Sequence, residues 1–333
     1  FIVGIPMFYS VGFVILIPLV FTVAASSGLP LIYVGLPMLA SLSVTHGFLP
    51  PHPAPTAISS MFNADIGKTL LYGIIIAIPA IIVAGPLFSR TIKNINATPL
   101  KEFYNPIILK DEEMPGMGIS VLTALLPVIL IIFSSIFTII YPGDSMFKEI
   151  IVFIGNPVIA MLISVLVAIY TLGLSRGKKM TELTTSISAS VSSITMVLLI
   201  IAGAGALKQI LIDSGVSDYI GALLDGSQIS PLILAWLIAT VIRVCVGSAT
   251  VAGLTAAGIV LPLISNSDVS PELMVLAIGS GSLMLSHVND AGFWMFKEYF
   301  NLTIKETLST WTVMETIVGV TGLIGVLILN IFI

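Results

Sequence analysis

Three histidines, one aspartate and one arginine are the residues of this 333-residue sequence that could do chemistry inside an otherwise apolar chain. His46 and His52 lie in a proline-rich stretch, and His287 lies three residues before Asp290. Histidine titrates near neutral pH and can relay a proton, and an acid at membrane depth is expected to be functional. These four residues are therefore candidates for proton coupling. The structural alternatives are hydrogen bonding at a membrane interface for the histidines and capping of a short helix for Asp290.

Arg243 is the only Lys or Arg deep within an apolar stretch. Placing an arginine at the centre of a bilayer costs roughly 2.5–3.5 kcal/mol on insertion scales. Its charge therefore needs compensation by Asp290, by backbone carbonyls or by an anionic ligand. Because the planar guanidinium can bind a carboxylate through two parallel hydrogen bonds, Arg243 is a candidate for binding an anion. A structural ion pair or a position at the membrane interface is the alternative.

Small residues follow Arg243, and we expect Gly247, Ser248 and Thr250 at the tip of a helical hairpin. Helix N-termini carry free N–H groups and partial positive charge, which bind anions. The two hydroxyls could contact hydroxyls of a ligand, with tight helix packing as the alternative. Further polar residues proposed for the same ligand site are Ser10, Thr45 and Asn289.

The composition is that of a polytopic membrane protein. Mean hydropathy is +1.12 and 9% of the residues are charged, against about 25% in soluble domains. A single cysteine excludes an intrachain disulfide framework, and the lack of long basic runs argues against nucleic-acid binding. No zinc-protease, nucleophile-elbow, P-loop or Cys-x-x-Cys motif is present, so we expect neither an enzyme nor a cofactor. A hydrolase built from Ser286, His287 and Asp290 is the alternative, although residues this close in sequence rarely converge on one atom.

A helix that crosses a bilayer needs about 20 apolar residues. Five stretches without internal charge meet this requirement, at residues 70–88, 119–141, 150–175, 183–207 and 316–333. Glu315, which precedes the last stretch, is interpreted as an ordinary partner of the helix dipole. Arg176, Lys178 and Lys179 form a short loop without acids, which the positive-inside rule assigns to the cytoplasm.

Three further apolar stretches do not fit simple spans. Residues 231–264 are too long for one helix, and we expect a re-entrant hairpin there. Residues 31–44 and 273–285 are too short to cross alone, and a histidine closely follows each. The prolines at 45–56 predict irregular backbone, because proline removes backbone donors. Such backbone is tolerated at membrane depth only where protein or a cavity surrounds it.

The two short stretches match each other as copies of an internal repeat. Pro30 and Pro271 are 241 positions apart, as are His46 and His287. Loop counting gives the copies opposite directions across the membrane, with a chance match of short apolar sequences as the alternative. Interrupted segments at corresponding positions of two halves indicate a transporter's binding site. We therefore predict an all-α polytopic membrane fold of inverted repeats with re-entrant hairpins and broken helices.

This organisation divides the chain into three parts. Residues 1–88 would form the end of a first inverted repeat, and residues 89–149 a cytoplasmic loop with a connecting transmembrane helix. Residues 150–333 would form a second inverted repeat with the hairpin 231–264 and a terminal helix. Because the chain begins at Phe1 without Met or a basic leader, we expect the first arm of the first hairpin to be missing.

Four motifs resemble the gluconate permease family of sugar-acid:proton symporters. They are the His-Gly-Phe-Leu-Pro-Pro-His-Pro string at 46–53 and the segments 65–70, 247–252 and 286–294. The resemblance implies a secondary transporter of the bacterial inner membrane for gluconate or a related acid, within the wider ion-transporter architecture. Family members also carry idonate, fructuronate, glycerate or D-serine, so the resemblance does not select the substrate.

The residues and the resemblance together predict a symporter that works by alternating access. Arg243 and the hairpin tip would hold an anionic substrate, and the proton would be the coupling ion. The competing hypotheses are another cargo, such as idonate, glycerate or D-serine, and a channel or a membrane scaffold that does not transport. The expected partners are a small anionic substrate, the lipid bilayer and other copies of the chain in a homo-oligomer.

Overall fold

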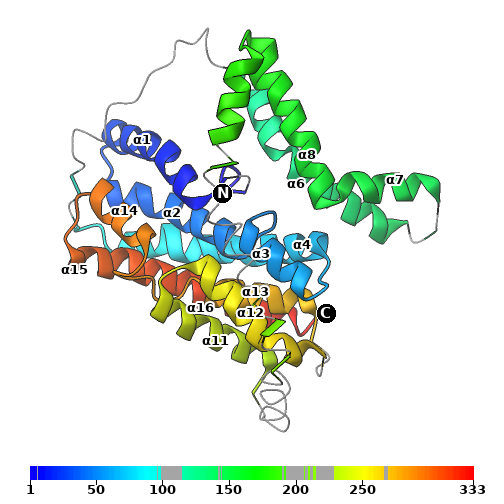
Figure 1. Ribbon diagram of the computed structural model, residues 1–333. Coiled ribbons are helices and arrows are strands. Elements are labelled where there is room, and N and C mark those ends of the chain that lie inside the picture. Colours follow the sequence, from blue (N-terminus) through cyan, green and yellow to red (C-terminus); the bar gives the residue numbers. More distant parts are fainter. Residues whose placement is uncertain are drawn as a thin grey trace.

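The computed structural model describes residues 1–5, 7–95, 97–98, 115–141, 143, 145–189, 191–192, 206, 209–210, 213–214, 229–265 and 269–333. All regular structure in these ranges is helical (Figure 1). Six helices among them are long and apolar enough to cross a membrane: Tyr9–Ser27, Leu31–Met61, Ile66–Thr91, Met117–Thr138, Val158–Arg176 and Ile304–Leu329. The all-α polytopic membrane fold is thereby confirmed.

The first helices are α1 (Tyr9–Ser27), α2 (Leu31–Phe48), α3 (Pro53–Met61) and α4 (Ile66–Ile82). The π-helical η1 (Val83–Leu87) joins α4 to α5 (Phe88–Thr91). Helix α2 runs through His46, so the predicted irregular backbone is confined to residues 49–52. Pro53 then begins α3, because proline is well suited to the first position of a helix.

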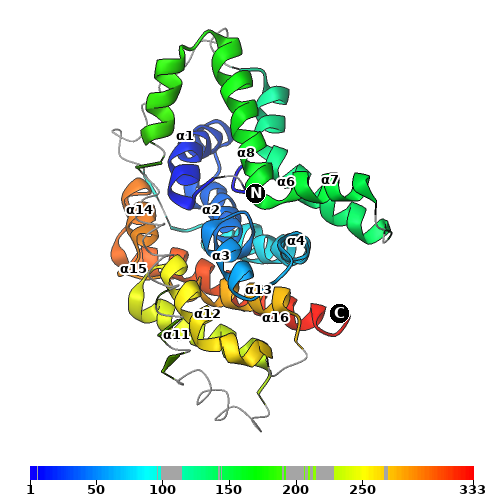
Figure 2. The same cartoon turned by 45° about the vertical axis from the view of Figure 1, so that its right-hand side comes forward.

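The middle of the chain forms a unit at the side of the bundle, visible in green in Figures 1 and 2. It comprises α6 (Met117–Ile140), α7 (Met146–Gly155), α8 (Pro157–Ala168), η4 (Ile169–Gly173) and η5 (Leu174–Arg176), and α6 packs against α4. The predicted single span 150–175 is wrong, since the chain breaks at Asn156. Pro157 disfavours helical backbone at Asn156, whose side chain instead caps α8. The predicted span 183–207 lies largely outside the described residues.

The second half contains the hairpin of α11 (Pro231–Val246) and α12 (Ala249–Ser265), which pack together as predicted for residues 231–264. It continues through α13 (Pro271–Gly281), α14 (Ala291–Tyr299) and α15 (Ile304–Thr307). The π-helical η6 (Leu308–Thr312) leads into α16 (Val313–Leu329). The last long helical segment therefore begins at Ile304 and not at residue 316, where the apolar pattern predicts its start.

The two short apolar stretches occupy the middle of the bundle. Every residue of α13 from Leu273 to Gly281 is buried. Helix α13 packs against α11, α2, α4 and α16, and α2 packs against α1, α4 and α16 (Figure 2). A helix that is apolar on all sides must be surrounded by other elements or by lipid, and here protein surrounds both.

Two turns that lead into long helices share a backbone geometry. Asn63 and Asn301 both adopt positive φ, at 53° and 51°. Each follows a phenylalanine, and four backbone hydrogen bonds around Asn63 recur around Asn301 with a shift of 238 residues. The spans that follow, Ile66–Thr91 and Ile304–Leu329, each have 26 residues. The shift of 238 differs by three from the 241 positions of the predicted repeat, so the repeat and the opposite directions of its copies across the membrane stay predictions.

Candidate functional site

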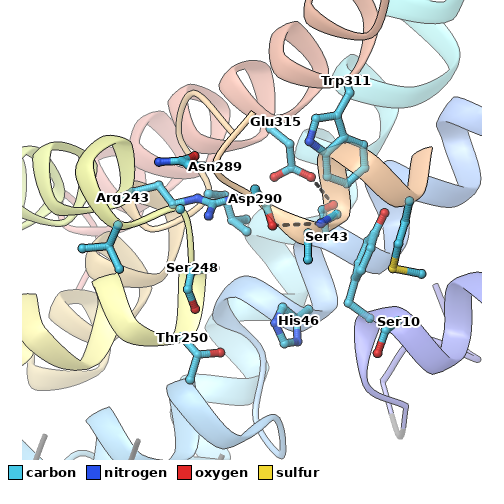
Figure 3. A pocket seen from close by; sticks show the side chains of 18 of the residues that line it. Ser10, Ser43, His46, Arg243, Ser248, Thr250, Asn289, Asp290, Trp311 and Glu315 are labelled. Carbon is cyan, nitrogen blue, oxygen red and sulfur yellow. Dashed lines mark hydrogen bonds and ion pairs between the residues drawn. The ribbon is translucent and has the colours of Figure 1, made fainter. Parts of the chain in front are cut away.

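A cavity of about 370 Å³ lies where the two halves of the chain meet (Figure 3). Its walls come from the start of α1, the C-terminal part of α2, the tip between α11 and α12, the segment before α14, and the junction of η6 with α16. Ser10 and Thr250 stand at the second positions of α1 and α12, and both line it. The cavity is therefore lined by helix starts from both halves of the chain.

Most residues proposed for binding from the sequence lie around this cavity. Eight of those eleven residues line it: Ser10, His46, Arg243, Gly247, Ser248, Thr250, Asn289 and Asp290. The other three lie outside the lining. The Thr45 hydroxyl donates to the Leu42 carbonyl at 2.9 Å, and Nε2 of the buried His52 lies 2.9 Å from the Gly4 carbonyl oxygen. His287 is half-buried beside the segment that carries Asp290.

Arg243 and Asp290 form an ion pair at the edge of the cavity (Figure 3). Arg243 is 3% exposed in the last turn of α11, and its Nη2 donates to Asp290 Oδ2. Removing one member of such a buried pair leaves an uncompensated charge, which is strongly destabilising. Asp290 is thus the compensation that the charge of Arg243 requires inside the bundle.

Three additional groups hold Asp290 in place. Its Oδ2 accepts a hydrogen bond from the Ser286 hydroxyl at 2.5 Å, and its Oδ1 accepts one from the Gly292 N–H at 2.9 Å, which caps α14. Ser286 in turn accepts a hydrogen bond from Trp311 Nε1 at 2.8 Å. The capping role and the ion-pairing role that the sequence left open for Asp290 therefore coexist.

Glu315 is the cavity residue whose position the sequence analysis did not anticipate. It is 2% exposed, lines the cavity and accepts a hydrogen bond from the Ser43 hydroxyl (Figure 3). Its interpretation as a dipole partner at a helix start is wrong, because the helical segment begins at Ile304 and continues through η6. The usable signal was a lone acid directly before the long apolar run 316–333, since an acid within a membrane span is a functional candidate.

The hairpin tip depends on the backbone of Gly247. Its φ of 79° lies in the left-handed region, and a Cβ at this position would meet the backbone of Asn289. The Ser248 hydroxyl accepts a hydrogen bond from the Val251 N–H at 3.4 Å and so caps α12. Asn289 Nδ2 donates to the Val244 carbonyl at 2.8 Å, which ties the tip to the segment before α14. The first N–H groups of α12 consequently lie at the cavity.

The buried polar atoms without a hydrogen-bond partner concentrate at this site. Six such side-chain atoms occur among the described residues, and five belong to residues that line the cavity: Tyr9 Oη, His46 Nδ1, Arg243 Nε, Arg243 Nη1 and Glu315 Oε2. Buried polar groups in native proteins nearly always have partners. The cavity therefore presents donors and acceptors suited to a polar ligand.

The site contains no obvious place for a metal ion. Within the described ranges, no group of three or more His, Cys, Asp or Glu side chains converges on one point. The acids present are already engaged, since Asp290 binds Arg243 and Glu315 binds Ser43.

Comparison with known proteins gives a consistent result. The model of the GntP family of permeases matches residues 1–332. A high-affinity gluconate transporter of Escherichia coli is 54% identical over 330 residues, which cover 99% of this chain and 75% of that protein. The L-idonate transporter of the Gnt-II system of the same organism is 51% identical, with 99% and 75% covered. A gluconate permease of Bacillus subtilis is 48% identical, with 99% and 76% covered.

The fold also has a solved counterpart. The YdaH transporter of Alcanivorax borkumensis, whose crystal structure has an unusual topology, aligns with a TM-score of 0.62. The alignment covers 96% of this chain and 73% of that one at 16% identity, so it demonstrates a shared fold alone. The relatives are permeases and transporters, not enzymes, and they agree with a multi-pass protein of the inner membrane. The chain belongs to the GntP family of permeases.

Proposed function

We propose that this protein is a proton-coupled permease that takes up gluconate or a closely related sugar acid by alternating access. The observation that carries the proposal is the clustering of unpartnered buried polar atoms around one cavity between the two halves of the chain. A sugar acid offers a carboxylate at one end and hydroxyls along the rest of its length. The carboxylate and the hydroxyls both find complementary atoms in the cavity wall. The volume of the cavity is typical of small-molecule sites.

The carboxylate would bind at the Arg243 end of the cavity. Arg243 donates to Asp290 through Nη2, whereas its Nε and Nη1 are buried and have no partner among the described residues. Two neighbouring N–H groups of one guanidinium match the two oxygens of a carboxylate. The N-terminus of α12 adds N–H donors and partial positive charge on the same side.

The hydroxyls would contact other polar groups of the cavity wall. Ser10 and Thr250 supply hydroxyls from the starts of α1 and α12, while Tyr9 Oη and His46 Nδ1 are buried without a partner among the described residues. Each of these atoms can exchange a hydrogen bond with a polyol. His46 is thus proposed as a substrate contact as well as a candidate for proton coupling.

L-Idonate is a second candidate substrate, because a transporter named for it is 51% identical to this chain. It differs from gluconate in the configuration of a hydroxyl, so the carboxylate contacts proposed above serve both acids. D-Serine is less suited to the cavity, since it has one hydroxyl where a sugar acid has several and would leave more of the unpartnered polar atoms of the wall without a hydrogen bond. We also propose that copies of the chain assemble into a homo-oligomer, which mass measurement in detergent would test.

The test is uptake of labelled gluconate by the full-length permease in proteoliposomes. We expect accumulation against the gluconate gradient when an inward proton gradient is imposed, and competition by unlabelled L-idonate stronger than by D-serine. Equilibration without accumulation would identify a channel. Absence of any gluconate binding or uptake, with active transport of D-serine or glycerate, would overturn the proposed substrate class.

A further inference from the structure

We propose that Glu315, hydrogen-bonded to Ser43 at the wall of the substrate cavity, is the residue that carries the coupled proton. The inference rests on the proposed function and names the group that would perform its proton coupling. It differs from the expectation drawn from the sequence, which assigned that role to the histidines and to Asp290. Three independent features of the site support it: the burial of Glu315, its charge environment and its place between the two halves of the chain.

Burial without a cation distinguishes Glu315. The described part of the chain has two fully buried charged residues, Arg243 and Glu315. Arg243 forms an ion pair, whereas the contact that binds Glu315 is the Ser43 hydroxyl, and Oε2 has no partner there. A buried carboxylate without a paired charge is costly, while a neutral carboxylic acid is tolerated far better. The site is therefore built for a group that can lose its charge.

The charged and titratable groups around Glu315 come from four elements. Arg243 faces the same cavity from α11, Asp290 from the segment before α14, Tyr9 from α1 and His46 from α2. Because Arg243 is already neutralised by Asp290, an ionised Glu315 makes the cavity negative before any substrate enters. A second anion would then be repelled.

Protonation of Glu315 removes this repulsion. In the proposed step, the carboxylate takes up one proton from the water on the side where the cavity is open, and an O–H bond forms at Oε2. That O–H can donate to the bound sugar acid. When the cavity opens to the other side and the acid leaves, the same O–H bond breaks and the proton departs to that side. Substrate and proton thus favour each other's binding by equal factors.

The position of Glu315 suits such a role in alternating access. Ser43 lies on α2 and Glu315 on α16, so the hydrogen bond joins the two halves of the chain at the cavity wall. The two bonded residues are 272 positions apart in the sequence, so the bond can respond to relative movement of the two halves of the chain. Asp290 lacks this freedom, because Arg243, Ser286 and Gly292 all donate to its carboxylate.

The experiment compares wild-type full-length permease with E315Q in proteoliposomes. Gln keeps the shape of Glu and can still accept from Ser43, but it cannot carry a proton. We expect E315Q to lose accumulation driven by a proton gradient by at least about tenfold, and to retain exchange of labelled for unlabelled gluconate without a gradient. The matched control is E298Q, since Glu298 is an exposed acid paired with Lys297 and lies outside the cavity lining. It should behave as wild type in both assays.

If E315Q loses gluconate exchange as well as accumulation, calorimetry tests whether Glu315 still accounts for the proton. Titration of gluconate in buffers of different ionisation enthalpy, at a pH alkaline enough to ionise Glu315 in the free protein, counts the protons taken up on binding, for which we expect about one in wild type and near zero in E315Q. Proton uptake by E315Q equal to wild type, gradient-driven accumulation by E315Q, or loss of gluconate binding by E315Q would each overturn the assignment. A wild-type protein that neither binds nor transports gluconate would instead overturn the proposed function, and the assignment with it.

Discussion

Asp290 and Glu315 line the same cavity in opposite surroundings. Asp290 is bound to a cation and accepts hydrogen bonds from a hydroxyl and a backbone N–H. Glu315 is more deeply buried, and its described hydrogen bond comes from a single neutral hydroxyl. Several donors therefore hold the first carboxylate, whereas the second has one neutral contact and an oxygen without a partner among the described residues.

This difference also separates two tasks in a symporter. The Arg243–Asp290 pair is suited to holding the substrate, since it orients a guanidinium whose remaining N–H groups lie at the cavity. The Ser43–Glu315 contact is suited to coupling, because the gain or loss of one proton alters the charge that the substrate meets. Variants of the Arg243–Asp290 pair should therefore weaken gluconate binding and preserve proton coupling, and variants of Glu315 should do the reverse.

The largest effect is expected from R243Q. The variant removes the proposed carboxylate contact, and hydrogen bonds to charged groups contribute roughly 1.5–3 kcal/mol. We expect kcat/KM for gluconate uptake to fall by roughly 10- to 150-fold, since 1.36 kcal/mol corresponds to a tenfold change. Initial rates in proteoliposomes at several gluconate concentrations would measure this. K297Q, which removes a half-buried cation paired with Glu298 outside the cavity lining, is the control and should be near wild type.

A double variant separates the binding role of Arg243 from its structural role. R243Q leaves the Asp290 carboxylate partly buried without its cation, so thermal stability should fall as well. R243Q combined with D290N removes both charges and should recover thermal stability in detergent while uptake stays low. Recovery of uptake together with stability would mean that the ion pair is purely structural.

Removal of the Ser286 hydroxyl should have an intermediate effect. S286A takes one donor from Asp290 and leaves Trp311 Nε1 without its acceptor. We expect the KM for gluconate to rise about tenfold, because one hydrogen bond to a charged group is lost, with proton-driven accumulation preserved. W311F is the matched variant, since it keeps the bond between Ser286 and Asp290 and should raise KM less. Loss of coupling in S286A would assign the proton to the Asp290 side instead.

The smallest effect is expected from E315D. Aspartate preserves an acid at this position but is one methylene shorter, so its contact with Ser43 is weakened. Net hydrogen-bond contributions of roughly 0.5–1.5 kcal/mol imply that uptake slows by about fivefold, while gradient-driven accumulation survives. Comparing E315D with E315Q separates the effect of a titratable acid from the effect of side-chain shape, because E315D keeps the acid and E315Q keeps the shape. Accumulation lost in E315D to the same extent as in E315Q would mean that geometry, not proton binding, is what Glu315 provides.

Much of the Arg243 region was predictable from the sequence. An arginine inside an apolar run needs a counter-charge, and Asp290 was among the candidates named for that role. The hairpin tip followed from small residues in the middle of a stretch too long for one helix, and Gly247 does adopt the left-handed backbone that only glycine favours. These features depend on local sequence and on the high cost of charge within a bilayer.

The Glu315 region was not predictable in the same way. Its hydrogen bond joins residues 272 positions apart, and local patterns do not encode such a meeting. The expected start of the last helix at residue 316 also placed Glu315 at an exposed helix end, whereas α15 and η6 extend the helical segment to Ile304. Similarly, Thr45 and His46 are neighbours on one helix, where successive side chains point about 100° apart, and only His46 faces the cavity.

The structure of the full-length permease with bound gluconate would test the central claim most directly. We expect the gluconate carboxylate within hydrogen-bond distance of Arg243 Nε and Nη1, with Asp290 still on Nη2 and the hydroxyls directed toward Ser10, His46 and Thr250. Gluconate bound away from this cavity, or bound in it with its carboxylate remote from Arg243, would contradict the account.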